Sequence, residues 1–213
     1  MSNKESFSWG LYNRAPIVGI VRGVATDVMQ DIAKAYVGAG LHTIEITMNT
    51  PDAAQMISML RSEFDQLNVG AGTVCTMEDY EKAVAAGAQF MVTPIIDETV
   101  IKTAVMQGIP VFPGAYTPTE IFKAWRLGAS AVKIFPATQL GVQFIKDIAA
   151  PLNNIKLLPT GGVSLENIKS FFEAGVVGVG MGSSLFDKRL IQERDFKGLA
   201  EHFTKIKAEI EGI

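Results

Sequence analysis

Two ionisable side chains fall inside segments that otherwise have the character of buried strands, and they are the first candidates for chemistry. Glu45 lies within the stretch 43–47, and Lys133 lies late in the stretch 131–135. Burying a charged group without a partner is costly, so each group is paired, neutralised or functional. Desolvation lowers the pKa of an amine, and a neutral amine can attack a carbonyl carbon. Glu45 and Lys133 are therefore candidates for an acid/base group and an amine nucleophile.

Structural roles compete with this interpretation. Glu45 could form a structural ion pair, because such networks also perturb buried carboxylates. Lys156, like Lys133, precedes a proline by three residues. It lies at the start of its expected strand, so we expect its side chain to be exposed to solvent. His42 lies on the strand face opposite Glu45, which predicts a packing or surface role. Cys75 follows a strand without an activating neighbour and is interpreted as a small buried thiol.

Groups that could bind anions follow three of the expected strands. Arg22 comes directly after the first strand, where its guanidinium could hold a carboxylate in two hydrogen bonds or could be solvated. Glycine-rich turns at 159–163 and 180–184 end the last two strands. In barrels, the loops after strands seven and eight commonly bind phosphate, helped by backbone N–H groups. The sequence contains neither the P-loop nor the dinucleotide glycine motif.

These residues are spread along a repeating pattern of short apolar strands and amphipathic helices. We expect strands at 16–21, 42–47, 68–73, 90–93, 110–112, 131–135, 155–158 and 176–180. We expect helices at 27–38, 52–64, 77–86, 98–107, 119–127, 142–149, 165–174 and 196–211. Alternating elements predict parallel strands with crossover helices, and about 27 residues per unit (213 divided by eight) fits an α/β, (β/α)8 TIM barrel. A doubly wound open sheet is the alternative, but polar residues inside several strands favour the barrel.

Composition limits the classes of partner and compartment. The 213 residues carry a net charge of −3 without a basic run, which argues against nucleic-acid binding. One cysteine and two histidines exclude a disulfide framework and a Cys/His zinc cluster. Without an apolar run near the roughly 18 residues of a membrane span, or a signal-peptide core, we expect a soluble cytoplasmic protein with no membrane partner. We expect one barrel domain over 1–213, with residues 1–13 as a short N-terminal helical extension at the barrel bottom.

Six short motifs occur in one order along the chain. They are Ile44–Thr47, Gly70–Val74, Val92–Pro94, Phe112–Gly114, Lys133–Ala137 and Pro159–Gly162. Together they resemble the family of 2-keto-3-deoxy-6-phosphogluconate (KDPG) aldolase and 4-hydroxy-2-oxoglutarate (KHG) aldolase, over residues 14–190. The resemblance implies a (β/α)8 barrel, usually a homotrimer, that acts as a class I aldolase without a metal or other cofactor.

The resemblance also implies roles for individual residues. Lys133, rather than Lys156, would be the Schiff-base lysine, and Glu45 would be the general acid/base. The pyruvyl part of the substrate would be lined by Thr73, Pro94 and Phe135, and the phosphate would be held by Thr160, Gly161, Gly162 and Ser183. In some members, an arginine lies four residues after the glutamate and grips the substrate carboxylate. This chain has Asn49 at that position. We expect Arg22 to hold that anion instead.

The expected reaction is the reversible cleavage of a 2-keto-4-hydroxy acid to pyruvate and an aldehyde. The aldehyde is glyceraldehyde 3-phosphate when KDPG is the substrate, and glyoxylate when 4-hydroxy-2-oxoglutarate is the substrate. The C4 epimer, 2-keto-3-deoxy-6-phosphogalactonate, stays open, because that branch also has an asparagine-containing version of the stretch around residue 49. Two other functions compete: a phosphosugar epimerase or isomerase barrel, whose metal-dependent forms need strand-end His and Asp ligands, and a non-catalytic phosphosugar-binding barrel.

Overall fold

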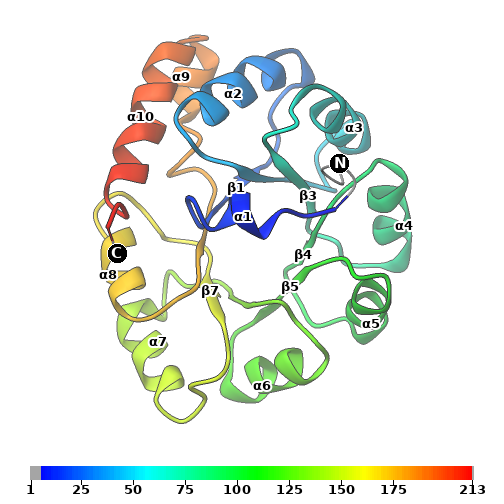
Figure 1. The fold of residues 1–213 in the computed structure, drawn as a ribbon, viewed down its shortest axis with the longest axis vertical. Helices are drawn as coiled ribbons and strands as arrows, with labels where there is room; N and C mark the ends of the chain where they lie inside the picture. Colours follow the sequence, from blue (N-terminus) through cyan, green and yellow to red (C-terminus); the bar gives the residue numbers. More distant parts are fainter. Residues whose placement is uncertain (1–5, 213) are drawn as a thin grey trace.

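A computed structural model describes residues 6–212 of the chain. Eight parallel strands form one sheet in the order β7-β6-β5-β4-β3-β2-β1-β8, and the helices surround it (Figure 1). A parallel bridge between Thr160, directly after β7, and Gly180 of β8 joins the two ends of that order and closes the ring of strands. The architecture is the expected (β/α)8 barrel, in which each helix carries the chain back to the start of the next strand.

The elements follow the expected order, with short differences at their ends. The strands are β1 Ile17–Val21, β2 Thr43–Thr47, β3 Asn68–Gly72, β4 Met91–Thr93, β5 Val111–Ala115, β6 Val132–Ile134, β7 Leu157–Pro159 and β8 Val179–Met181. The helices are α1 Trp9–Tyr12, α2 Thr26–Gly38, α3 Ala53–Glu63, α4 Met77–Ala85, α5 Glu98–Met106, α6 Pro118–Arg126, α7 Gly141–Ala149, α8 Ile168–Glu173, α9 Lys188–Gln192 and α10 Phe196–Ala208. The sequence did not predict α9, because its five residues are too few to show a helical period.

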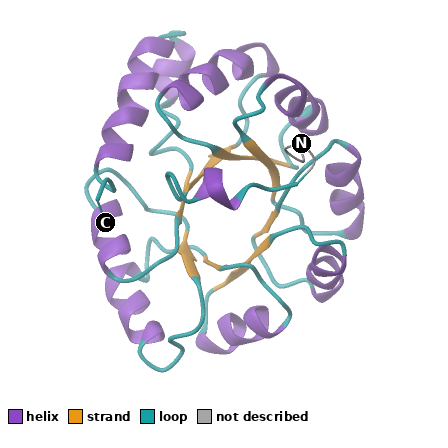
Figure 2. Cartoon of the chain, in the orientation of Figure 1, coloured by secondary structure: helices purple, strands orange, loops and turns teal. Residues whose placement is uncertain are grey.

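The strands divide their side chains between two cores. The helices form a layer outside the strands (Figure 2). Ile44 and Ile46 of β2, like Val132 and Ile134 of β6, belong to the large apolar cluster that the strands share with the helices. Because side chains alternate along a strand, Glu45 and Lys133 point into the barrel. The same alternation turns Thr43 and Thr47 inward, and all five residues of β2 are buried.

The N-terminal segment closes one end of the barrel with aromatic rings. Phe7 and Tyr12 pack with Phe90 and Phe112 in an interior cluster, and α1 lies across that end (Figure 1). The Tyr12 hydroxyl also donates a hydrogen bond to the Val177 carbonyl at 3.1 Å. The expected N-terminal helix at the barrel bottom is therefore present at Trp9–Tyr12, while residues 1–5 of the expected extension lie outside the described residues.

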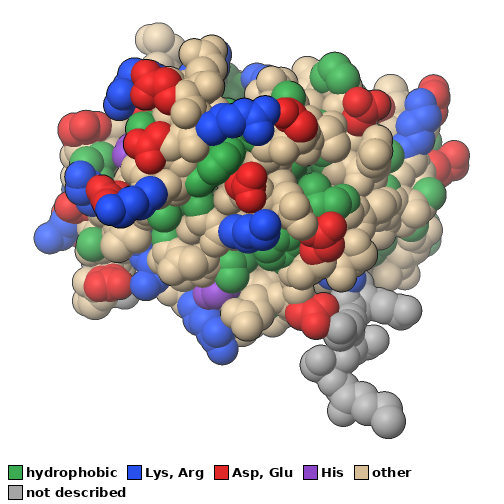
Figure 3. Space-filling view, turned by 90° about the horizontal axis from the view of Figure 1, so that it is seen from above, with side chains coloured by type: hydrophobic (Ala, Val, Ile, Leu, Met, Phe, Trp, Pro, Cys, Tyr) green, Lys and Arg blue, Asp and Glu red, His purple; other side chains and the backbone are tan. Residues whose placement is uncertain are grey.

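The outer surface carries charges of both signs. On the side of the barrel that includes α2 and α9, Lys and Arg side chains alternate with Asp and Glu (Figure 3). One ion pair there joins Arg194 to Asp27. Within residues 6–212, every helix is too short or too polar to cross a membrane.

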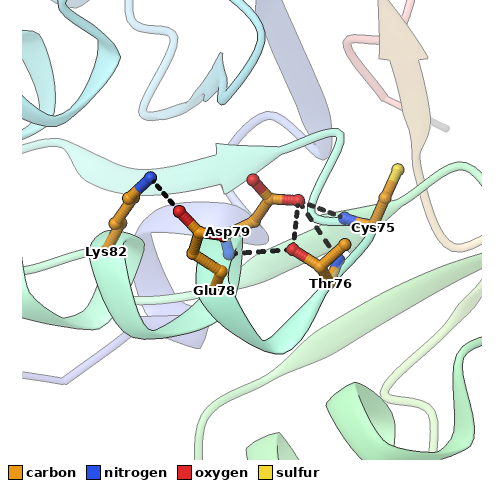
Figure 4. A network of polar contacts seen from close by, with 5 residues as sticks. All are labelled: Cys75, Thr76, Glu78, Asp79 and Lys82. Carbon is orange, nitrogen blue, oxygen red and sulfur yellow. Dashed lines mark hydrogen bonds and ion pairs between the residues drawn. The ribbon is translucent and has the colours of Figure 1, made fainter.

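Capping boxes hold two of the loops that follow strands at the opposite end. Before α4, Asp79 accepts hydrogen bonds from the Cys75 and Thr76 N–H groups at 3.1 Å, and Thr76 accepts one from the Asp79 N–H (Figure 4). Before α6, Glu120 accepts hydrogen bonds from the Tyr116 and Thr117 N–H groups. Each box satisfies N–H groups at the helix start and fixes the loop leading into it.

Candidate active site

The sheet order places the two candidate catalytic side chains on opposite walls of the barrel. Glu45 is on β2 and Lys133 is on β6, four strands apart in a ring of eight. Both side chains are inside the barrel, with only 1% of Glu45 and 4% of Lys133 exposed. The structure therefore buries the two ionisable residues that the sequence singles out, and it leaves the rival Lys156 exposed before β7.

The Glu45 carboxyl group is poised between its two protonation states. Burial raises its pKa to about 7, against the opposing effects of the nearby Lys133 and Arg22 charges. Its Oε2 atom is buried and makes no hydrogen bond with any described residue. The other oxygen lies over β3, where a Cβ atom on Gly72 would approach Oε1 to 2.5 Å. Gly72 thus makes room for a carboxyl group that can both take and return a proton near neutral pH.

Lys133 is an amine in an environment that disfavours its charge. Burial lowers the pKa of its ammonium group, and the Arg22 charge lowers it further, while Glu45 and Cys75 act in the opposite direction. The Nζ atom lies 4.6 Å from the centre of the Phe135 ring, over its face. A lowered pKa increases the fraction of neutral amine, which is the form that adds to a carbonyl group.

A cavity of about 770 Å³ opens at the C-terminal ends of the strands. It collects most of the residues expected in the site: Arg22, Lys133, Phe135, Thr160, Gly161, Gly162 and Ser183. Glu45 is not among the residues that line the cavity, and its charge raises the pKa of the Lys133 amine against the effect of burial. The cavity thus joins a buried amine to the two glycine-rich turns.

Thr73 and Pro94 are at the correct end of the barrel but outside the cavity lining. Thr73 follows Gly72 with a left-handed φ of 55°. Pro94 packs on β5, where a Cβ atom on Gly114 would lie 2.5 Å from the Pro94 carbonyl oxygen. Gly114 pairs with Lys133 in the neighbouring strand, so Pro94 packs against the strand beside that of Lys133.

The two glycine-rich turns are tied together by side chains. Gly161 and Gly162 have φ values of 89° and 77°, a left-handed conformation that favours glycine. The Ser184 hydroxyl donates to the Val163 carbonyl at 2.5 Å, which joins the β8 turn to the β7 turn. On the other side, a ring nitrogen of His202 donates to the Ser184 carbonyl at 2.8 Å. Such rigid backbone is suited to holding an anion with N–H groups.

The cavity also includes residues that the sequence did not suggest. They come from the start of α2, from α9 and from the turn after it: Val24, Asp27, Lys188, Ile191, Gln192 and Arg194. Four of them, Asp27, Lys188, Gln192 and Arg194, are exposed polar or charged residues, which a sequence does not distinguish from ordinary solvated surface. Across residues 6–212, no three His, Cys, Asp or Glu side chains group together as metal ligands would.

The family model for "KDPG and KHG aldolase" matches residues 11–201. The chain belongs to this aldolase family. It is 35% identical to the 2-dehydro-3-deoxy-phosphogluconate aldolase of Treponema pallidum (strain Nichols) over 56% of this chain and 57% of that protein. The chain spans a similar share, less than two thirds, of the next curated relatives it matches.

Two solved structures of similar proteins extend the comparison to nearly the whole chain. One, described as a native KDPGal structure, is 32% identical, with a TM-score of 0.86 over 96% of each chain. Another is KDPG aldolase from Legionella pneumophila with pyruvate captured as a covalent carbinolamine intermediate. It is 26% identical, with a TM-score of 0.84 over 92% of this chain and 96% of that one. Barrel and aldolase family are thus established together.

Proposed function

We propose that this member of the family is a class I aldolase in which Lys133 forms the Schiff base and Glu45 moves the protons. The observation that carries the proposal is the buried amine of lowered pKa, placed across the barrel from a buried carboxyl group with a pKa of about 7. The relative from Legionella pneumophila, with pyruvate bound covalently, supports the same chemistry. No other buried lysine is found among the described residues.

The reaction begins when the neutral Lys133 amine adds to the C2 carbonyl of a 2-keto-4-hydroxy acid. Loss of water gives a protonated imine, which accepts electrons from the C3–C4 bond. Glu45 takes the proton of the C4 hydroxyl group through a bridging water, and the C3–C4 bond breaks to release an aldehyde and leave an enamine. Glu45 returns the proton to C3, and hydrolysis of the imine releases pyruvate and regenerates Lys133.

The anionic groups of the substrate are assigned to the two ends of the cavity. Arg22 holds the carboxylate, since the chain has Asn49 where some family members carry an arginine. The backbone of Gly161, Gly162 and Ser183 holds the phosphate, with Thr160 beside it, and Thr73, Pro94 and Phe135 surround the pyruvyl carbons. These positions predict cleavage of KDPG to pyruvate and glyceraldehyde 3-phosphate, and of 4-hydroxy-2-oxoglutarate to pyruvate and glyoxylate.

The substrate is tested by measuring pyruvate release from three compounds: KDPG, its C4 epimer 2-keto-3-deoxy-6-phosphogalactonate, and 4-hydroxy-2-oxoglutarate. We expect the highest kcat/KM for a phosphorylated substrate, and loss of all activity in Lys133→Ala with activity retained in Lys156→Ala. A higher kcat/KM for the epimer than for KDPG would reassign the substrate. Binding of all three without pyruvate release would leave a non-catalytic phosphosugar-binding barrel.

We also propose that the chain forms a homotrimer through one face of the barrel, which we call the α4–α6 face. Of the seven exposed large apolar side chains in residues 6–212, all but Trp9 lie on it: Val84, Ile95, Val105, Met106, Tyr116 and Phe122. Met106, the most exposed, has 79% of its surface open. Contiguous apolar side chains on a surface are typical of protein interfaces. On this face Glu98 of α5 pairs with both Lys102 and Lys123, so these three charges partly neutralise one another within one chain.

Light scattering coupled to gel filtration tests the assembly. We expect a mass of about 69 kDa, three times the 23.0 kDa chain. Phe122→Glu should lower it to the monomer mass, while Lys34→Glu on α2, outside the α4–α6 face, should leave it unchanged. A monomeric wild-type protein, or a trimer that tolerates Phe122→Glu together with Met106→Glu, would reject this face.

A further inference from the structure

A buried threonine after β2 holds the loop that carries Arg22. The Gly23 N–H group donates a hydrogen bond to Thr50 Oγ1 at 3.0 Å, across 27 positions of sequence. Gly23 has a left-handed φ of 63°, so the backbone turns directly after Arg22. Thr50 is only 4% exposed, although both Arg22 and Gly23 are exposed at the cavity.

Thr50 is itself fixed to the strand that carries Glu45. Its hydroxyl lies 2.9 Å from the Thr47 hydroxyl, and its N–H group donates to the Thr47 carbonyl at 2.8 Å. Thr47 is fully buried and lies two residues after Glu45, on the same inward face of β2. A continuous hydrogen-bonded path therefore runs from the strand of Glu45 to the residue next to Arg22.

We propose that Thr50 is a positioning residue that sets the place of the Arg22 guanidinium relative to Glu45 and Lys133. The inference rests on the proposed function, in which Arg22 holds the substrate carboxylate. Arg22 also lowers the pKa of both Glu45 and Lys133, so its place affects both substrate affinity and the protonation of the pair. Thr50 touches no reacting atom and acts only through the loop.

The test compares Thr50→Val with Thr50→Ser. Valine has nearly the shape of threonine but leaves the Gly23 N–H without its acceptor, whereas serine keeps the hydroxyl. We expect Thr50→Val to raise KM for KDPG about tenfold, equivalent to about 1.4 kcal/mol, with kcat within about threefold of wild type. Thr50→Ser should restore the wild-type KM. If Thr50→Val fails to fold, Thr50→Ala removes the same acceptor and should show the same rise.

The pH profile adds a readout that a change in stability alone does not move. If Arg22 shifts away from the pair, the pKa values of Glu45 and Lys133 should both rise, because Arg22 lowers both. The inflections of kcat/KM against pH should therefore move to higher pH in Thr50→Val and return in Thr50→Ser. Unchanged inflections together with an unchanged KM would overturn the proposal.

Thr43→Val is the matched control. Thr43 is buried on the same inward face of β2, and its hydroxyl accepts a hydrogen bond from Asn68 at 3.2 Å, away from the Arg22 loop. We expect it to lower stability without changing KM, and an equal rise in KM would show that Thr50 has no special role. Trapping pyruvate on wild-type Lys133 with borohydride separates the two claims. Without an adduct both fail, whereas an adduct with a normal Thr50→Val would reject only the role of Thr50.

Discussion

Glu45 and Lys133 obtain their chemistry from burial on opposite walls of one barrel. Desolvation raises the pKa of the Glu45 carboxyl group to about 7, and it lowers the pKa of the Lys133 amine. Each charge partly offsets the shift of the other, which keeps both groups within reach of the protonation states that the proposed reaction needs. Gly72 leaves the space that the carboxyl group occupies, because a Cβ atom there would lie 2.5 Å from Glu45 Oε1.

The pH dependence of the rate reports on Glu45. The carboxylate is the form that accepts a proton, so kcat/KM should rise with pH and show an inflection near pH 7 that belongs to Glu45, besides the rise that follows loss of the Lys133 proton. Glu45→Gln should lower kcat by roughly 10²- to 10⁴-fold and remove this inflection. The measurement is a pH series of initial rates for both proteins. An inflection near pH 7 that persists in Glu45→Gln would assign it to another group.

Gly72→Ala tests the space under the carboxyl group. A Cβ atom there would lie 2.5 Å from Glu45 Oε1, so the side chain must move. We expect kcat to fall at least about tenfold, because a displaced proton-transfer group loses its alignment. Gly38→Ala is the control, since a Cβ atom there meets nothing within 4 Å. Wild-type kcat in Gly72→Ala would show that the position of the carboxyl group is not critical.

The sequence predicted a buried acid and a buried amine but not the residues beside them that the proposed mechanism also uses. An acid or an amine inside an apolar strand stands out, which is why Glu45 and Lys133 could be identified. Thr50 and Gly72 are ordinary residues whose importance depends on what the fold places beside them, a Gly23 N–H group and a carboxyl oxygen. Thr73 and Pro94 were expected in the pocket by resemblance, and they lie beside the cavity rather than on its lining.

At the scale of elements, local signals account for the order of strands and helices. The capping boxes at Thr76 and Thr117 are visible as short sequence patterns and are formed in the structure. The eighth strand was expected from residue 176 but begins at Val179. Before it, the Val177 carbonyl accepts a hydrogen bond from the Tyr12 hydroxyl. Helix α9 carries too short a pattern to be predicted, yet it lines the cavity through Lys188 and Gln192.

Asp79→Ala tests how the loop after β3 is held. Asp79 accepts hydrogen bonds from the Cys75 and Thr76 N–H groups, and its loss should cost about 1 kcal/mol of unfolding free energy. Glu78→Ala, in the same turn, removes an exposed ion pair with Lys82 and should cost less than Asp79→Ala, because solvent screens that pair (Figure 4). Urea unfolding of both variants gives the comparison. Equal losses would mean that the capping box adds nothing beyond a surface charge.

At the scale of the whole molecule, the aromatic cluster that stabilises the fold and the cavity of the proposed site lie at opposite ends of the barrel. The aromatic cluster of Phe7, Tyr12, Phe90 and Phe112 closes one end, and the cavity opens at the other. Barrels commonly divide their two ends in this way, which lets the loops at the C-terminal ends of the strands vary without loss of the core. The sequence predicted the overall architecture because its alternation of strand and helix runs through the chain.

Phe7→Ala tests this separation. Phe7 is 8% exposed within the aromatic cluster, so its truncation should cost about 3 kcal/mol of unfolding free energy. Because the cluster is at the far end of the barrel, kcat/KM should stay within about twofold of wild type. Trp9→Ala, at a position 43% exposed, should cost less. A large loss of kcat/KM in folded Phe7→Ala would show that the two ends are coupled.

The central claim is that Lys133 is the amine that bonds to pyruvate, and borohydride reduction tests it most directly. The protein is incubated with saturating pyruvate, reduced, digested and analysed by mass spectrometry. We predict a reduced pyruvate adduct on Lys133, absent in Lys133→Ala and retained in Lys156→Ala. An adduct on Lys156, or none on any lysine of the folded protein, would contradict the account.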